Sequence, residues 1–206
     1  MKEIAEIQIG YQAKKAIEPK ADSDWQIIQL RDFGDDRQLK KKPLTRFKVE
    51  RNPERYRVNS GDVLFLYRGY KNFGYAINRD LENVVAAGYF YILKILDESV
   101  LPEYLAWYLN QESTRKYFQR NARQGTNMPV IGKSAFENFS VRIPHLRVQN
   151  LIVNLDKELR RERSLTKSIQ KERMKLFSAM SMRVLSNSTI AREANSEGSK
   201  WRVKKT

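Results

Sequence analysis

Hydrophobic and polar residues follow one another along the first part of the chain in short runs that are typical of β-strands. Residues 4–9 alternate with a period of two, and residues 25–30 form a second short strand. Residues 63–67 are apolar throughout, which favours a buried strand. Two further strands are predicted, a mostly apolar one over residues 84–96 and an alternating one over residues 139–143.

Helical spacing of apolar residues begins after these strands. Pro102 can open a helix, because its missing N–H would be unpaired there, and apolar residues follow it to Leu109. Residues 113–118 predict a second helix. From Leu146 no Gly or Pro occurs until Gly198, so the sequence predicts a helix of about 30 residues, about 45 Å long.

The long helix carries an apolar stripe that this chain alone cannot bury. Its first two turns can pack against the chain's own domain, but the later turns have nothing left to cover them, so a partner helix or partner protein is expected. The residues assigned to this partner-binding stripe are Leu151, Ile152, Leu155, Leu159, Leu165, Ile169 and Leu176.

These elements together predict an α/β (α+β) fold with one main core. Residues 1–145 form a mixed-sheet domain, and residues 146–180 form a long helical arm that pairs as a coiled coil. Residues 181–206 are a basic polar tail, in which little regular structure is expected.

Charge points to a polyanionic partner. The chain has 206 residues and a formal net charge of +15, with an isoelectric point near 10.0, and such a field concentrates nucleic acid at the surface. Ribosomal and membrane-surface proteins are also cationic, so charge alone does not choose among them. The 41% hydrophobic content is enough for a packed core.

Absent residue types exclude several classes of protein. The chain has no Cys, which excludes disulfide frameworks, thiolate metal sites and cysteine nucleophiles. Its N-terminus lacks the apolar core of a signal peptide, and no segment has the roughly 20 apolar residues that cross a bilayer. A cytoplasmic location without membrane contact is expected.

Catalytic constellations are missing as well. His145 is the single histidine, so neither a Ser-His-Asp triad nor a multi-histidine metal site can form, and a surface or hinge role is favoured for it. The glycines are not spaced as in phosphate-binding loops. Asp62 and Asp80 are isolated carboxylates rather than a nuclease pair, so an enzymatic function is disfavoured.

A basic segment over residues 37–57 is the first candidate for binding nucleic acid. It holds nine Lys or Arg residues against two Glu residues, and its two prolines favour exposed loops with short extended pieces. A solvated charged surface explains any single one of these residues equally well. The residues predicted to contact phosphates are Lys40, Lys41, Lys42 and Arg46, together with Lys133 further along the chain.

Two polar loops carry side chains suited to reading bases. Residues 68–74 combine two glycines with cationic, aromatic and amide side chains, and residues 120–127 form a second polar loop. Arg suits guanine, and Asn or Gln suits adenine. The residues predicted to read bases are Arg68, Tyr70, Lys71, Asn72, Arg123, Gln124, Thr126 and Asn127.

Several segments, taken in order, resemble the specificity subunits of type I restriction-modification systems. Residues 57–64, RVNSGDVL, followed by Arg68-Gly69, are similar to a family strand that opens with Gly-Asp-Val/Ile-Leu. Residues 102–110, PEYLAWYLN, resemble the helix after the central strands. Gly125-Thr126, residues 129–131 and the Ile-Pro that precedes Leu146-x-x-Gln149 resemble the family's closing pattern, so the likeness covers about residues 57–160.

The resemblance implies a half-length, non-catalytic subunit with one target-recognition domain and one long helix, where family members carry two of each. Its partners would be double-stranded DNA, a DNA methyltransferase subunit and a restriction or translocase subunit in a prokaryotic cytoplasm. The chain itself would hold no cofactor, because S-adenosylmethionine would belong to the methyltransferase. Two copies would pair through the long helices and read a bipartite site.

Two other classes of function stay open. One is a non-catalytic interaction or regulatory protein that uses its helix to bind a partner and reads no bases. The other is an RNA-binding module, which would need exposed aromatic platforms, whereas Tyr89, Phe90 and Tyr91 lie in a run apolar enough to be core.

Overall fold

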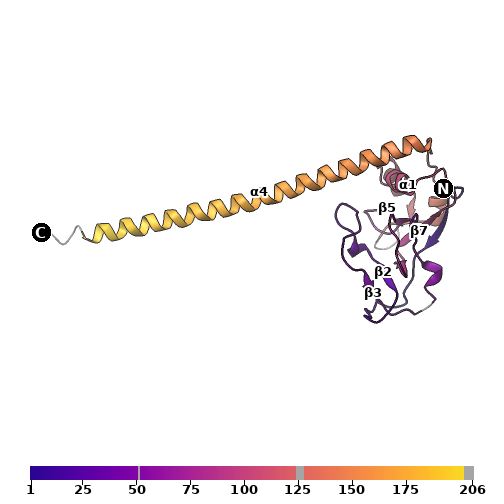
Figure 1. Cartoon of the computed structure of the whole chain (residues 1–206), viewed down its shortest axis with the longest axis horizontal. Coiled ribbons are helices and arrows are strands. Elements are labelled where there is room, and N and C mark those ends of the chain that lie inside the picture. The colour runs from indigo at the N-terminus through magenta and orange to yellow at the C-terminus, as the bar shows by residue number, and fades with distance from the viewer. Residues whose placement is uncertain (51, 124–127, 202–206) are drawn as a thin grey trace. The chain divides into compact units, whose positions relative to one another are not determined.

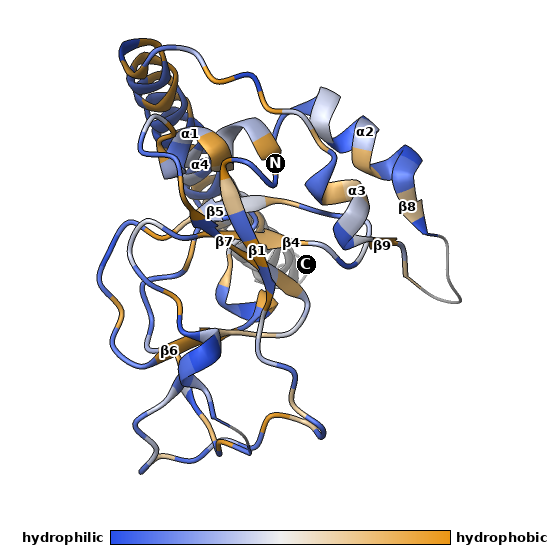
Figure 2. Ribbon diagram, turned by 90° about the vertical axis from the view of Figure 1, so that its right-hand side faces the viewer, coloured by the Kyte–Doolittle hydropathy of each residue, from blue (hydrophilic) through white to orange (hydrophobic). Residues whose placement is uncertain are grey.

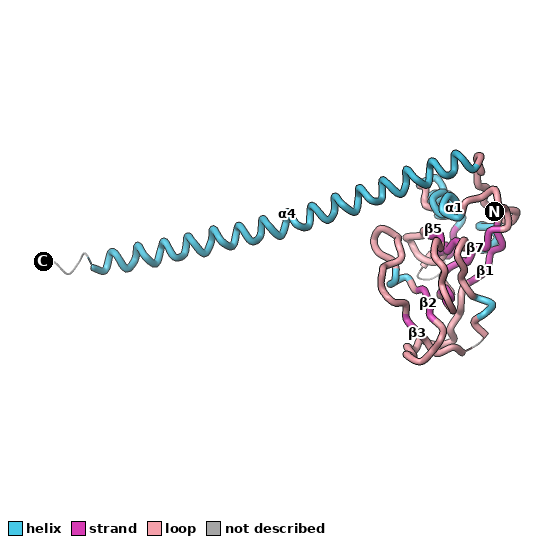
Figure 3. The backbone as a smooth tube through the Cα atoms, in the orientation of Figure 1, coloured by secondary structure: helices cyan, strands magenta, loops and turns pink. Residues whose placement is uncertain are grey.

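The computed structural model describes residues 1–50, 52–123 and 128–201, with side chains as far as residue 186. The chain divides into two units, Met1–Asp156 and Lys157–Thr206 (Figure 1). The first unit holds every strand that the structure describes, joined by long loops (Figure 3). The described residues of the second unit, 157–201, are helical.

Two sheets form the centre of the first unit. The larger has the strand order β1-β7-β4-β5 with antiparallel neighbours. In the smaller, β3-β2-β6, the central strand is antiparallel to β3 and parallel to β6. The strands are β1 (Ala5–Ile9), β2 (Gln26–Ile28), β3 (Thr45–Arg46), β4 (Val63–Leu66), β5 (Gly74–Ala76), β6 (Val84–Ala86) and β7 (Phe90–Ile95), with a separate pair, β8 (Ala122–Arg123) and β9 (Val130–Ile131).

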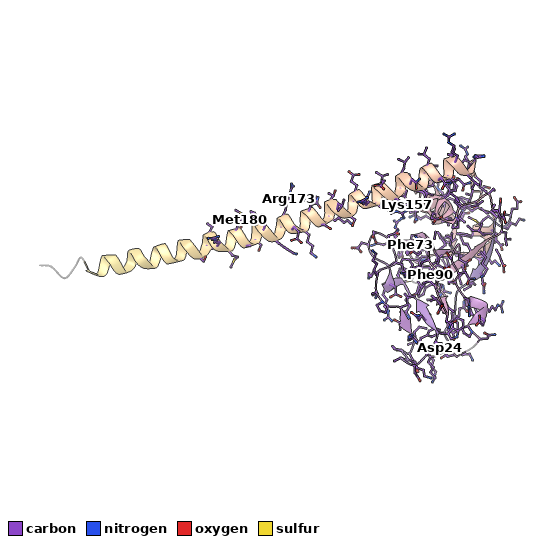
Figure 4. All side chains as sticks on the ribbon, in the orientation of Figure 1. Asp24, Phe73, Phe90, Lys157, Arg173 and Met180 are labelled. Atoms are coloured by element: carbon purple, nitrogen blue, oxygen red, sulfur yellow. The ribbon has the colours of Figure 1, made fainter. Side chains whose placement is uncertain are left out.

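The strand β4 is buried on both faces, as its unbroken apolar run predicts. Val63 and Phe65 belong to a core shared with the helices, whereas Leu64 and Leu66 belong to a second core shared with the smaller sheet. Because successive side chains of a strand point to opposite faces, one strand serves both cores. Burial of each such side chain stabilises the fold by about 1.5–3 kcal/mol. In the second core Phe73 packs on Phe90 at 6.3 Å between ring centroids (Figure 4).

Three short helices cover the first core. They are α1 (Pro102–Leu109), α2 (Glu112–Asn121) and α3 (Lys133–Glu137), and 3-10 turns lie at Leu30–Asp32 and Glu54–Tyr56. The predicted start of α1 at Pro102 is confirmed, and the helix expected over residues 113–118 is α2. A Cβ on Gly74 would lie only 3.1–3.3 Å from Leu109 and Ala106, so this glycine lets α1 approach β5 closely.

The single strand predicted over residues 84–96 is wrong, because the chain changes sheets within it. Strand β6 pairs with β2, and after a turn closed by the Phe90 N–H to Ala87 O hydrogen bond (3.0 Å), β7 enters the larger sheet. Both strands are buried on both sides, so no polar residue marks the turn. Gly88 is its one sequence signal, and a Cβ there would lie 2.8 Å from Gln12.

The strand predicted over residues 139–143 is also wrong. The segment is extended and packs Phe139, Val141 and Ile143 on the first core, which explains its alternating pattern. Its carbonyl groups bond elsewhere: Phe139 O accepts from the Met1 amino group (2.7 Å) and Arg142 O from the Tyr104 hydroxyl (2.6 Å). The alternation of apolar and polar side chains in this segment therefore reflects burial of one side, not pairing with another strand.

The helix α4 (Leu146–Trp201) begins where the sequence predicts, and its first three turns belong to the first unit. Gln149 and Val153 are buried there, whereas Leu151 and Leu155 are more than half exposed. The Gln149 side chain donates to Ser99 O and Pro144 O (2.7 Å each) and accepts from Leu101 N–H (2.9 Å). The face that packs on the domain is therefore offset from the leucine stripe.

The second unit, described by itself, continues α4 through residues 157–201. The expectation of little regular structure from residue 181 is wrong as far as Trp201, because no proline and only Gly198 interrupts a helix-compatible composition. Arg173 and Met180 project from this helix with exposed side chains (Figure 4). Among the described residues no helix is long and apolar enough to cross a membrane.

Candidate nucleic-acid interface

The first and second loops predicted to read bases place Arg68 and Arg123 on either side of one short strand, β9. Gly69 N–H donates to Pro129 O (2.9 Å) and Ile131 N–H donates to Tyr67 O (3.0 Å), which pairs Arg68 with Val130 across an antiparallel bridge. Figure 2 shows β8 and β9 side by side, close to α2 and α3. Residues 67–69, which follow β4, therefore form a small three-stranded ledge with β9 and β8, which we call the reading ledge.

The two sides of the reading ledge differ in chemistry. Tyr67 and Ile131 are buried in the first core, and Ala122 packs against it. Arg68 and Arg123 are exposed, and both stand in register with Val130. Residues in register on neighbouring strands share a face, so the two guanidinium groups emerge on the outer side of the ledge.

A pair of buried tyrosines in the first core packs beneath the inner side of the reading ledge. The rings of Tyr67 and Tyr91 stack at 4.1 Å between centroids with an interplanar angle of 16°. The Tyr91 hydroxyl donates to Ile131 O (2.9 Å), and the Tyr67 hydroxyl donates to Gly88 O (2.9 Å). Burial raises the pKa of Tyr91 to about 12, so its hydroxyl keeps its proton and remains a donor at neutral pH.

Arg68 is held against this aromatic base. Its Nε donates to the Tyr67 hydroxyl (3.1 Å), and its Cζ lies 5.3 Å from the centroid of the Tyr67 ring. Among the described residues nothing bonds to its Nη1 or Nη2 atoms. An anchored guanidinium with that edge available has the donor geometry that guanine O6 and N7 accept.

The rest of the first loop is ordered by its own amide. Asn72 Nδ2 donates to Leu66 O (2.8 Å), so one of the groups predicted to read adenine holds the loop instead. Gly69 has φ +99°, a conformation that favours glycine. Tyr70 is 77% exposed and Lys71 is exposed beside it, which leaves both side chains available at the tip.

The basic segment adjoins the same end of the sheets. Tyr67 N–H donates to Tyr89 O (3.2 Å), and the Tyr89 hydroxyl accepts from Leu30 N–H (2.8 Å). The turn that Leu30 begins contains buried Asp32, whose carboxylate lies 3.2 Å from Lys42 Nζ. A continuous chain of contacts thus links the reading ledge to the lysines that follow this turn.

The predicted phosphate-binding cations differ in how far they are engaged. Lys40 Nζ donates to Arg31 O (2.8 Å), Arg46 Nη1 to Ser23 O (2.8 Å), and Lys133 Nζ lies 3.6 Å from a Glu137 carboxylate oxygen. Lys41 is exposed and pairs with no described residue. Gln124, Thr126 and Asn127 lie outside the described residues.

Sequence reasoning missed three residues that complete the interface. Tyr67 and Tyr91 looked like ordinary core, although tyrosines in a buried strand need a partner for each hydroxyl, which is a usable signal. Arg31 is exposed, and its Nη2 donates to Thr45 Oγ1 (2.9 Å). Its position shortly after β2, in the turn whose Leu30 bonds to Tyr89, could have indicated it.

Nothing that the structure describes resembles a metal centre. No group of three or more His, Asp or Glu side chains lies where it could hold an ion, within the described part of the chain. His145 is exposed, and its Nδ1 accepts from Arg147 N–H (3.3 Å) at the start of α4. Its surroundings are those of a surface residue at a helix start.

Comparison with known proteins shows the family of this chain. Residues 2–172 match the type I restriction modification DNA specificity domain. The chain belongs to this family. Its specificity domain therefore spans the sheets, the reading ledge and the first turns of α4, together with the start of the second unit.

A solved structure gives a further comparison. The S subunit of a type I restriction-modification system from M. genitalium matches with a TM-score of 0.47 and 14% sequence identity. The match covers 75% of this chain and 36% of that one, so the specificity domain described here spans 36% of that subunit's length. Among curated proteins, none matches the sequence.

Proposed function

We propose that this specificity domain recognises a specific sequence in double-stranded DNA by presenting the reading ledge to base edges. The observation that carries the proposal is the register of Arg68 and Arg123 with Val130 on an aromatic base. Two guanidinium groups on the segments that flank β9, in register with the same residue, can contact bases a short distance apart in the major groove, which admits a β-ribbon. The chain would position a modifying enzyme without itself altering DNA.

Phosphate contacts would set the register of the domain on the duplex. Lys41 has no partner among the described residues, and Lys40, Lys42 and Arg46 are exposed. Exposed cations beside a reading surface fix orientation without reading sequence. Gln124, Thr126 and Asn127 remain proposed base contacts, with no described geometry behind them.

The long helix would supply the second half of the site. Residues of the stripe from Leu151 to Leu176 are at least half exposed, apart from partly buried Ile152. A second copy offers the same stripe, and two helices pairing antiparallel would place two identical readers on one split palindrome. The charged segment Arg160–Arg163 interrupts the stripe and would help to set the register of the pair.

The partners of such a dimer would be a DNA methyltransferase subunit, which would bind S-adenosylmethionine, and a restriction or translocase subunit. The exposed stripe also favours a second candidate function, a regulatory protein that binds a partner helix and reads no bases. The two candidates differ in what they require of DNA.

Selection from a random pool of duplexes with the full chain separates them. Specific reading predicts enrichment of one motif with two inverted, identical halves at a fixed spacing. A chain that binds all duplexes equally, or none, while retaining a helical partner, would show that the regulatory function is correct. Mapping methylated bases after co-purification from the host would identify the methyltransferase.

A further inference from the structure

Arg37 occupies a position in a tight hairpin where glycine is normally favoured. Phe33 and Leu39 pair across this hairpin, and Gly34 N–H donates to Gln38 O (2.9 Å). Arg37 closes the turn through its N–H to Gly34 O (3.0 Å) with φ +61°. An arginine in the left-handed region is uncommon, and such a residue points to a purpose for its side chain.

The Arg37 side chain reaches the junction between α1 and α2. Its Nη1 donates to Asn110 Oδ1 (3.2 Å). Arg115, in the first turns of α2, is partly buried there, and its Nε is buried without a hydrogen-bond partner among the described residues. Burial, and after it the positive charge of Arg115, lowers the pKa of Arg37.

Among the described residues, no carboxylate forms an ion pair with Arg37 or Arg115. Glu112 is the acidic residue nearest in sequence on α2, and it bonds to Lys116 at 2.8 Å. The Asp36 carboxylate accepts from Gln38 N–H (3.1 Å) within the hairpin. Arg37 bonds to Asn110, and the Arg115 backbone N–H donates to the carbonyl of Gln111 (3.0 Å), so two partly buried cations lie at this junction, where an anion would stabilise both.

The junction between α1 and α2 lies at the same end of the larger sheet as the loop of residues 68–74. Asn110 Oδ1 also accepts from Gly74 N–H (3.2 Å), and Asn110 Nδ2 donates to Gly74 O (2.8 Å). Gly74 pairs with Phe65 near the end of β4, where the loop that carries Arg68 begins. An anion held at the junction would therefore lie beside that loop.

We propose that Arg37 and Arg115 together hold one phosphate of the DNA backbone next to the reading ledge. This inference rests on the proposed function. Arginine suits the role because its planar group bonds phosphate with two parallel N–H donors, which a lysine cannot match. The phosphate would fix the hairpin of residues 33–39 against the DNA without contributing base preference.

Arg37 could instead have a purely structural role, in which its bond to Asn110 holds the hairpin in place. The two roles predict opposite effects of Arg37→Gly on the unfolding temperature. Arg37→Gly removes the side chain but relieves the left-handed backbone, so it keeps or raises the unfolding temperature if the side chain serves DNA. It lowers the unfolding temperature if the contact with Asn110 is what matters.

The experiment compares the parent chain with Arg37→Gly, Arg37→Lys, Arg115→Gln and the double variant Arg37→Gly/Arg115→Gln. Arg79→Gly is the matched control, since Arg79 is exposed near Ile77, which bonds to Gly61 at the opposite end of β4. Thermal unfolding and binding to the selected duplex at several salt concentrations are measured.

Arg37→Gly should weaken binding about tenfold and reduce the salt slope by about one, with base preference unchanged. Arg37→Lys should recover the slope but not all of the affinity. The double variant should lose no further slope, because both residues share one phosphate. Unchanged affinity and slope in Arg37→Gly, or a loss matching that of Arg79→Gly, would overturn the inference. A parent chain that binds no DNA would instead overturn the proposed function.

Discussion

Tyr67 stacks on Tyr91 with ring centroids 4.1 Å apart, and the hydroxyl groups of the pair hold two different segments. Tyr67 bonds to Gly88 in the turn between β6 and β7, whereas Tyr91 bonds to Ile131 in β9. Strand β9 is not part of either main sheet, so this hydroxyl and the bridge at Arg68 fix its position. The precision of the reading ledge therefore depends on a buried aromatic pair.

Tyr91→Phe should test that dependence. The ring keeps its stack, but Ile131 O loses its donor, so the free energy of unfolding should fall by about 1 kcal/mol. Base preference should relax as well, because β9 is held less firmly. Denaturant unfolding and duplex selection measure the two effects. Tyr70→Phe, at an exposed position, should leave stability unchanged, and a Tyr91→Phe variant with full stability and selectivity would refute the supporting role.

Asp62 gives a pH dependence of known sign. Its carboxylate is buried, accepts from Asn59 N–H (2.8 Å) and lies 3.9 Å from Lys94 Nζ. Burial raises the pKa of Asp62, although Asn59 and Lys94 oppose the shift. The folded chain therefore binds this proton more tightly than the unfolded chain, and the contribution of Asp62 to stability falls as pH rises through the carboxylate range.

Asp62→Asn removes this titration and keeps an acceptor for Asn59. The variant should gain stability relative to the parent as pH increases from about 3 to about 7. Urea unfolding at several pH values measures the difference. A difference that shrinks with rising pH would mean that the contact with Lys94 dominates and that the sign is wrong.

Gln149 ties the start of α4 to the first unit. Its buried amide serves Ser99 O, Pro144 O and Leu101 N–H, and Gln149→Leu would leave all three without this partner. We expect a loss of about 3 kcal/mol in the free energy of unfolding. Asn150→Ala, at the neighbouring exposed position, should change it by less than about 0.5 kcal/mol. Equal effects of both substitutions in denaturant unfolding would contradict this account.

The exposed stripe predicts self-association through α4. Leu155→Glu should convert a dimer to a monomer, because it buries a charge in the apolar seam, and should leave the unfolding temperature of the first unit nearly unchanged. Asn154→Glu adds the same charge on the preceding residue, which is not one of the stripe residues, and should preserve the dimer. Sedimentation equilibrium distinguishes the two. A parent chain that stays monomeric at all concentrations would exclude the homodimer.

Local patterns predicted several elements in which one face, or every side chain, is buried. The strands at residues 5–9 and 63–66, the start of α1 and the start of α4 all follow from periodicity. The break at Gly88 was hidden because apolar strands continue on both sides of it. The end of α4 was missed because a polar composition does not by itself end a helix.

The candidate site was predictable in composition but not in geometry. Glycines and mixed polar side chains identified the loop that begins at Arg68, and a polar segment identified the loop around Arg123. The pairing of both arginines with Val130 joins distant segments of the chain, which no local pattern reports. The use of Asn72 within its own loop was equally invisible, because an amide suits a base and a carbonyl alike.

Duplex selection with the parent, Arg68→Ala and Lys41→Ala chains tests the central claim most directly. The parent should enrich one motif, and Arg68→Ala should lose preference at particular base pairs, at a cost of about 1–3 kcal/mol. Lys41→Ala should keep the motif while weakening every duplex and reducing the salt slope by about one. Equal losses on all sequences for both variants would contradict the division between a reading ledge and a phosphate-binding segment.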